Sequence, residues 1–329
     1  MLKRWFWWLA AGVLLLFLWR QVDMAELQHS VAQIPWQVLV ALLVVQIVTQ
    51  VLLNFQWYRI AKLAAIDIPF WRMFYINAQG SVMESITPGV KVGGEITRAV
   101  QIARIGNCSG HQAAVVVALQ KIFSLSAFVL INIFSVLYLS NRSALFPTSP
   151  AKIAILGVLV VFVLIFCLMF LLPKRMLNWL AAKEEVRPNR SGAVRRFLQN
   201  LLEHILLFEN QSGELILQFV LALAIWLLYP AKLYVLAVQI QPDIPLVYIG
   251  SITFVSYLIG MLPLFPGGLG GFEGTMTGLL RGLGVPLSGA AALAVIFRFV
   301  TFWFVILVSL CYAAVYNMIN RHNLNLKEC

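Results

Sequence analysis

Two stretches of the chain share one pattern: PGVKVGGEIT at 88–97 and PGGLGGFEGT at 266–275. An ungapped shift of 178 residues gives 9 identities over the 30 positions from 88 to 117. Composition bias produces apolar matches, but it does not place proline, glycine and glutamate in the same spacing. Both copies lie between long apolar segments. Such a Gly/Pro break with an acidic residue, at matching places in two halves, is typical of a transport site at a repeat interface.

The composition indicates an all-α integral membrane protein. Hydrophobic residues make up 61% of the chain and charged residues 11%, and several runs reach the roughly 20 apolar residues that cross a bilayer. The formal net charge is +11, but most basic residues flank apolar segments, where they orient a membrane protein. We therefore expect no nucleic-acid partner. The four cysteines have no metal-ligand spacing, so we expect neither a metal nor another cofactor.

The hydropathy pattern predicts one membrane domain over residues 1–329, with about six full spans. These lie at 5–19, 36–58, 111–139, 151–172, 214–236 and 287–317. Two further apolar segments, 70–87 and 246–264, each lead into a Pro-Gly break. They predict re-entrant hairpins or broken helices, because irregular backbone at membrane depth persists only where protein or a water-filled cavity satisfies it.

The loop charges predict the orientation. Residues 173–213 hold seven basic and four acidic side chains, which indicates a cytoplasmic basic linker. With both termini also cytoplasmic, the chain is a multi-pass protein of the cytoplasmic (inner) membrane. The two hairpins then enter from opposite sides, which makes the repeat inverted in topology. Its halves are residues 36–139 and 214–317.

Glu95 and Glu273 are the repeated carboxylates. A carboxylate at membrane depth is costly and suggests a function, here proton coupling or pairing with a cation on the substrate or on Arg298. The alternative is structural, since either glutamate can satisfy free backbone N–H groups where a broken helix restarts. The sequence leaves both interpretations open.

Lys121 and Arg298 each lie about ten residues into a long apolar segment, hence roughly 15 Å deep at 1.5 Å per residue. A central cation costs about 2.5–3.5 kcal/mol on insertion scales. One interpretation is a phosphate or carboxylate partner, which suits the planar fork of arginine. The other is an internal ion pair with Glu95, Glu273 or Glu84. The two are compatible if a pair opens to admit an anionic headgroup.

Three further features belong to the candidate site. Glu84 has no acidic counterpart in the second half, which suits either a role on one face or a solvated side chain. Lys91 and Arg98 make the first hairpin basic, which either favours anions from the cytoplasm or only reflects the positive-inside rule. Glycines in both copies permit tight turns whose N–H groups can hold a phosphate, or else close helix packing; they include Gly93, Gly267 and Gly271.

The second copy, with Pro266 to Glu273, a Gly-Val pair at 284–285 and then a span bearing Arg298, resembles the lysylphosphatidylglycerol synthase transmembrane-region family, also called UPF0104. The stretch from Gly93 to Ala99 is similar to the Gly-Glu-x-x-Arg motif of that family. The resemblance implies a membrane protein that moves lipids or lipid-linked sugars between leaflets. Larger relatives carry a soluble aminoacyl-transfer domain after the membrane part. Because this chain ends at Cys329, we do not expect it to aminoacylate lipids.

The resulting prediction is a flippase for an anionic phospholipid or a polyprenyl-phosphate-linked lipid, whose partners are membrane lipids with anionic headgroups. The alternative is a non-transporting membrane partner of a lipid-modifying or polysaccharide-synthesis enzyme, such as a glycosyltransferase. An enzymatic role is not expected, because the sequence has neither an acidic cluster for a metal nor a recognisable nucleophile motif.

Overall fold

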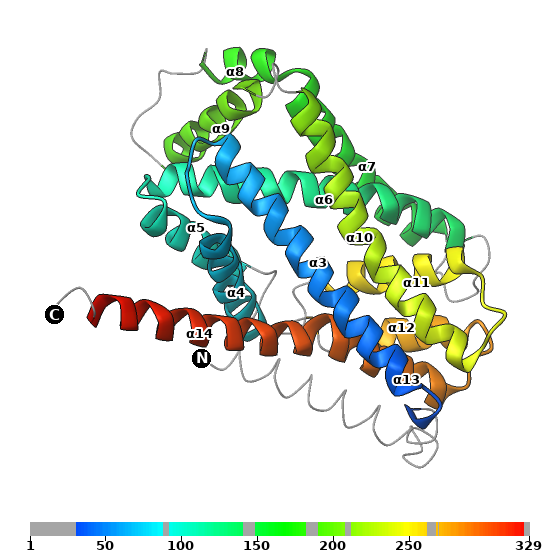
Figure 1. Cartoon of the computed structure of the whole chain (residues 1–329). Helices are drawn as coiled ribbons and strands as arrows, with labels where there is room; N and C mark the ends of the chain where they lie inside the picture. The colour runs from blue at the N-terminus through cyan, green and yellow to red at the C-terminus, as the bar shows by residue number, and fades with distance from the viewer. Residues whose placement is uncertain are drawn as a thin grey trace, which may run out of the picture.

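A computed structural model describes residues 31–87, 92–140, 149–181, 190–207, 212–261, 268 and 270–325. Within these ranges the chain is helical, with connecting turns and no strand. The long helices are α3 (Trp36–Leu63), α6 (Gly110–Ser140), α7 (Ser149–Leu171) and α10 (Ser212–Ile240) (Figure 1). A last long element joins α13 (Leu287–Arg298), the π-helical turn η3 (Phe299–Trp303) and α14 (Phe304–Asn325). The all-α membrane fold predicted from composition is confirmed.

Four helical segments are long and apolar enough to cross a bilayer: Trp36–Leu63, Gly110–Ser140, Gly213–Ile240 and Leu287–Ile319. They have 28 to 33 residues, against the roughly 20 that a span needs. They match four of the six predicted spans. The predicted span 151–172 forms α7, of which Ile155–Phe166 counts as a shorter apolar helix. The predicted span 5–19 lies outside the described residues.

Each predicted break separates two short helices. In the first half these are α4 (Phe70–Ile86) and α5 (Val92–Ile105), and in the second they are α11 (Leu246–Gly260) and α12 (Gly271–Arg281). The two members of each pair pack closely against each other. None has more than 17 residues, so none reaches the length of a full span. This is the geometry expected of helical hairpins, although the Pro-Gly dipeptides themselves lie outside the described residues.

Proline marks the start of four helices. A proline cannot donate the backbone hydrogen bond that a helix interior needs, but it costs nothing where the first N–H groups have no helical partner. The helices α3, α4, α11 and α13 each begin directly after one, at Pro35, Pro69, Pro245 and Pro286. Pro69 and Pro245 each end an Asp-Ile-Pro tripeptide, at 67–69 and 243–245, so the same tripeptide precedes α4 and α11.

The helices of the two halves interlock. Helices α3 and α10 pack against each other, and Figure 1 shows them running side by side through the middle of the molecule. Helix α4 of the first half packs along α14 of the second, whereas α11 of the second packs along α6 of the first. This reciprocal exchange is what two related halves produce when they meet face to face. Their relation as an inverted repeat stays a prediction.

The predicted linker 173–213 contains helices α8 (Pro173–Ala181) and α9 (Arg190–Leu207), which lie together at the top of Figure 1. Helix α9 packs on α6 and α8, and its apolar side is buried at Leu201, Leu202 and Ile205. The described parts of this segment are thus helical where the sequence suggested a linker. Its cytoplasmic location stays a prediction.

Buried amides tie three of the spans together. The Gln56 side chain of α3 donates to the backbone carbonyl of Gln218 on α10, at 3.1 Å. The Gln120 side chain of α6 donates to Gln56 Oε1 at 3.2 Å. Lipid tails offer no hydrogen-bond partners, so these groups favour helix association. The bonds hold α3, α6 and α10 beside the cavity described next.

Candidate functional site

A cavity of 210 Å³ lies where the two halves meet. Liquid water occupies about 30 Å³ per molecule, so the cavity has room for several waters or a small polar headgroup. Its lining comes from both halves. Four charged side chains reach it: Glu84, Arg98, Lys121 and Arg298. Six aromatic side chains also line it: Trp57, Trp226, Tyr229, Tyr257, Phe272 and Phe302.

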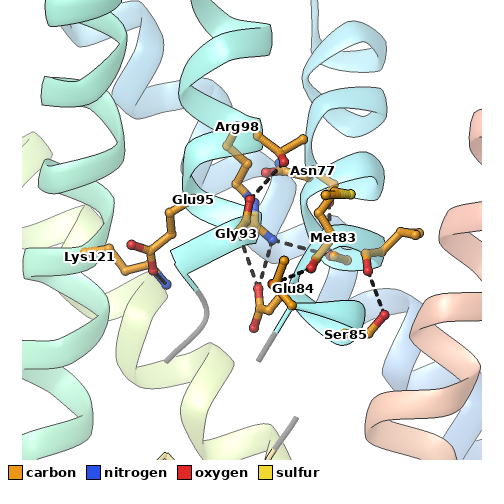
Figure 2. Close-up of polar contacts among 12 residues, drawn as sticks. Asn77, Met83, Glu84, Ser85, Gly93, Glu95, Arg98 and Lys121 are labelled. Atoms are coloured by element: carbon orange, nitrogen blue, oxygen red, sulfur yellow. Dashed lines mark hydrogen bonds and ion pairs between the residues drawn. The ribbon is translucent and has the colours of Figure 1, made fainter. Parts of the chain in front are cut away.

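The first ion pair of the cavity joins the two helices of the first hairpin. Arg98 of α5 reaches Glu84 of α4, as Figure 2 shows, with its terminal nitrogens 3.3 and 3.4 Å from Glu84 Oε2. Arg98 is only 5% exposed, and its guanidinium also lies 5.5 Å from the ring of Trp57. Arg98 is therefore a buried partner of Glu84, and Glu84 is not the solvated side chain that was one of its two interpretations.

Two glycines make this pair possible. A Cβ atom at Gly80 of α4 would lie 2.5 Å from Arg98 Nε, and a Cβ atom at Gly94 of α5 would lie 2.6 Å from the carbonyl oxygen of Gly80. Any larger residue would force the two helices apart. The glycines of the first hairpin thus serve close packing, one of the two roles that the sequence allows.

The second ion pair joins α5 to the span that follows it. Lys121 Nζ of α6 lies 2.7 Å from Glu95 Oε1, in the first turn of α5. Figure 2 shows the two side chains together, beside the Arg98–Glu84 pair. About a quarter of each side chain is exposed, 27% for Lys121 and 28% for Glu95. A pair with this much access can exchange its partner for a ligand.

The third ion pair is the counterpart in the second half, although Arg298 aligns with Gln120 and so lies one residue from the position that matches Lys121. Arg298, the last residue of α13, has Nε 3.1 Å from Glu273 Oε1, in the first turn of α12. The other oxygen of Glu273 accepts a hydrogen bond from the N–H of Gly270 at 2.7 Å. Gly270 has φ +83°, a conformation that glycine adopts without strain. Glu273 therefore does both things proposed from the sequence: it caps the restarted helix and pairs with Arg298.

Aromatic rings hold the guanidinium of Arg298 on two sides. Its Cζ atom lies 5.0 Å from the ring centroid of Phe272 and 4.3 Å from that of Phe302. Phe302 belongs to η3, where the N–H of Phe304 bonds to the carbonyl of Phe299, five residues back. Such π turns often mark functional sites. The turn places Phe302 over a cation that is 7% exposed.

The predicted site residues thus fall into three groups. Six of them form three ion pairs: Glu84, Arg98, Glu95, Lys121, Glu273 and Arg298. Gly93 and Gly271 lie in the first turns of α5 and α12, and each carbonyl accepts a bond from the threonine hydroxyl four residues on. Lys91 and Gly267 lie outside the described residues. In the described part of the chain, no three His, Cys, Asp or Glu side chains gather to hold a metal ion.

Lys232 is a site feature that the sequence analysis missed. It lies within the apolar helix α10, two residues after Pro230, and is 1% exposed. A lysine inside a predicted span was the available signal, but it has no counterpart in the repeated motif. Its neighbour Tyr229 and the other cavity aromatics gave no signal at all, because aromatic residues are common throughout the spans.

The fold and the cavity together define a polytopic helical membrane protein with a charged, aromatic-lined site between its helices, to which both predicted halves contribute residues. Residues 6–309 match the family described as the lysylphosphatidylglycerol synthase TM region. The chain belongs to this family, as its sequence motifs led us to expect.

Similar proteins with curated descriptions occur in archaea. A UPF0104 membrane protein of Methanothermobacter thermautotrophicus is 25% identical over 280 residues, covering 82% of each chain. One from Methanocaldococcus jannaschii is 19% identical over 271 residues, covering 79% of each chain. One from Pyrococcus horikoshii is 21% identical over 269 residues, covering 75% of this chain and 78% of its own. These alignments extend across most of the membrane domain.

Proposed function

We propose that this protein moves a lipid with an anionic headgroup, an anionic phospholipid or a polyprenyl-phosphate-linked lipid, between the leaflets of the cytoplasmic membrane. The family name points to lipid metabolism or transport. The single observation that carries the proposal is the cavity, because it brings three cationic side chains from both halves into one space between membrane-spanning helices. Both termini are cytoplasmic in this proposal, and the protein is not an enzyme.

The ion pairs supply the binding chemistry. A phosphate can take the place of a carboxylate on Lys121 or on Arg298, because both cations line the cavity while Glu95 and Glu273 approach them from outside its lining. Arginine offers a planar fork that matches two phosphate oxygens. The exposed Lys121–Glu95 pair is the easier one to open, whereas the aromatic clamp fixes Arg298 in place.

The aromatic wall suits the rest of the headgroup. Rings such as those of Trp226 and Tyr257 offer large, rigid apolar faces with one polar edge. Trp226 keeps its indole N–H bonded to the backbone carbonyl of Ser124, at 3.0 Å. The ring is thus fixed in the cavity wall, where it can pack against a glycerol or a sugar unit.

The test is lipid movement in liposomes that hold the purified protein and a leaflet-specific fluorescent lipid. The proposal expects the wild-type protein to accelerate an anionic lipid above the rate of empty vesicles. Arg298→Ala is expected to lower that acceleration by tenfold or more, because the variant loses the clamped cation. Gly110→Ala is the matched control, since Gly110 begins α6 and a methyl group there meets no atom within 4 Å.

Two outcomes contradict the proposal. If the wild-type protein moves no anionic lipid faster than empty vesicles do, transport by the isolated protein is excluded. The alternative, a non-transporting partner of a lipid-modifying enzyme or glycosyltransferase, would then be favoured. If lipids move but Arg298→Ala matches the wild-type rate, the cavity is not the route.

A further inference from the structure

Lys232 is an ammonium buried without a carboxylate. In the part of the chain that the structure describes, its Nζ forms no ion pair. It donates to Gln46 Oε1 and to Thr49 Oγ1, the latter at 3.2 Å, and lies 4.3 Å from the ring centroid of Tyr229. Gln46 and Thr49 belong to α3, and Tyr229 belongs to α10, so Nζ lies between these two helices.

The surroundings of Nζ fit the charged form of lysine. An ammonium has three donors and no acceptor, and here it meets two oxygens and one π face. The Thr49 hydroxyl gives its own proton to the carbonyl of Val45, at 2.7 Å, so it can only accept from Lys232. The oxygen of Gln46 faces Nζ, and neither the Thr49 hydroxyl nor the Tyr229 ring donates to it. Burial opposes the charge, and the two oxygens and the π face are the groups that favour it.

The charge lies directly behind the cavity wall. Tyr229 lines the cavity, and Lys232 lies over the ring of the same tyrosine. Each of the three cations that line the cavity has a carboxylate partner: Arg98 pairs with Glu84, Lys121 with Glu95 and Arg298 with Glu273. Lys232 therefore adds one positive charge that no described carboxylate neutralises.

We propose that Lys232 is the specificity-determining charge of the cavity, which makes it prefer a headgroup with one net negative charge over a zwitterionic one. The inference rests on the proposed function, since it concerns the lipid that enters the same site. Lys232 does not contact the headgroup. Its charge acts on the headgroup electrostatically, across the side chain of Tyr229. One unit charge at roughly 10 Å, in an effective dielectric of about 20, changes a binding constant by about tenfold.

Two short-chain lipids with identical dihexanoyl tails test the inference in detergent. Phosphatidylglycerol carries one negative charge, whereas phosphatidylethanolamine is neutral overall. Their dissociation constants for the purified protein are measured by intrinsic tryptophan fluorescence, because Trp57 and Trp226 line the cavity. We expect the wild-type protein to bind phosphatidylglycerol about tenfold more tightly. Lys232→Met should reduce that ratio to nearly one.

The matched control is Asn54→Leu. Asn54 occupies the place in α3 that Lys232 occupies 178 residues later in α10, and it is also 1% exposed. The change removes a buried polar side chain but no charge, so the tenfold ratio should remain. Melting temperatures report whether each variant is folded. Lys232→Gln, which keeps a donor for Gln46, replaces Lys232→Met if the latter does not fold.

The inference is overturned if the wild-type ratio is near one, if the neutral variants keep a tenfold ratio, or if Asn54→Leu lowers it equally. The transport proposal and the inference about Lys232 can be refuted independently of each other. If no lipid moves in liposomes but the ratio responds to Lys232, the transport proposal falls and the selectivity stands. If lipids move in liposomes but the ratio of dissociation constants is the same with and without Lys232, only the inference about Lys232 is refuted.

Discussion

The ion pairs Glu273–Arg298 and Glu95–Lys121 are counterparts in the two halves, yet they should differ in their contribution to stability. The perturbation is the substitution of each glutamate by glutamine, which preserves shape and removes the charge. In the second half the side chains of Arg298 and Glu273 are 9% and 15% exposed. In the first half the exposure of Lys121 and Glu95 is two to three times greater, at 27% and 28%.

The magnitudes follow from burial and from the bonds that are lost. Removing one partner of a buried pair costs about 3–5 kcal/mol, because the other charge stays buried. Glutamine at position 273 keeps one oxygen for the N–H of Gly270 or for Arg298, so we expect about 3 kcal/mol for Glu273→Gln. Exposed pairs contribute about 0–1 kcal/mol, and we expect no more than that for Glu95→Gln.

Thermal unfolding of the purified protein in detergent, followed by tryptophan fluorescence, measures the difference. At roughly 2–3 °C per kcal/mol, Glu273→Gln should lower the Tm by about 6–9 °C and Glu95→Gln by no more than about 3 °C. Adding Arg298→Gln to Glu273→Gln should recover part of the loss, because it removes the uncompensated cation. Equal losses for the two glutamates, or a double variant that shows the sum of its single losses, would refute this reasoning.

Two further predictions concern the first half. Gly80→Ala should destabilise the protein by about 1–3 kcal/mol, because the added Cβ atom would lie 2.5 Å from Arg98 Nε. In the same melting experiment Gly110→Ala should be neutral or slightly stabilising, since it meets no atom within 4 Å; equal losses for the two variants would contradict the packing argument. Burial raises the pKa of the Cys108 thiol in the turn between α5 and α6, so less of it is thiolate at pH 8 than of an exposed cysteine. In a variant whose other cysteines are replaced by serine, Cys108 should react with iodoacetamide more slowly at pH 8 than an exposed cysteine does. The exposed reference is a cysteine introduced by Ser109→Cys in a Cys108→Ser background. The difference between the two reaction rates should become smaller at pH 10. Equal rates at both pH values would count against this.

The sequence predicted the features that depend on local chemistry. Apolar length predicted the four helices that are long enough to span a bilayer, and the repeated Pro-Gly break predicted the two pairs of short helices. Ion pairing of Lys121 and Arg298 with nearby glutamates was one of two stated alternatives. Glu95 and Lys121 are close in sequence, as are Glu273 and Arg298, so the connecting turn brings each pair together.

Other features depend on how the helices pack against one another. Lys232 donates to Gln46, 186 residues away in the chain, and no local pattern reports such a contact. Arg98 reaches Glu84 only because α4 and α5 approach closely at Gly80 and Gly94. Hydropathy tells how apolar a helix is, but it does not tell which side of the helix meets another helix.

The π turn η3 also has a geometric consequence for the second half. It holds one residue more than the α turn it replaces, and each residue of a helix advances by about 100°. Every side chain of α14 is therefore rotated by about this angle relative to an uninterrupted helix. In this orientation the ring of Tyr316 stacks on that of Tyr75, with 4.2 Å between the ring centroids, and the Tyr312 hydroxyl donates a hydrogen bond to the backbone carbonyl of Trp71. Helix α6, which has no such turn, makes its own aromatic contact with α11 between Tyr138 and Tyr248, so the extra residue beside Arg298 is a feature of the second interface and not of the first.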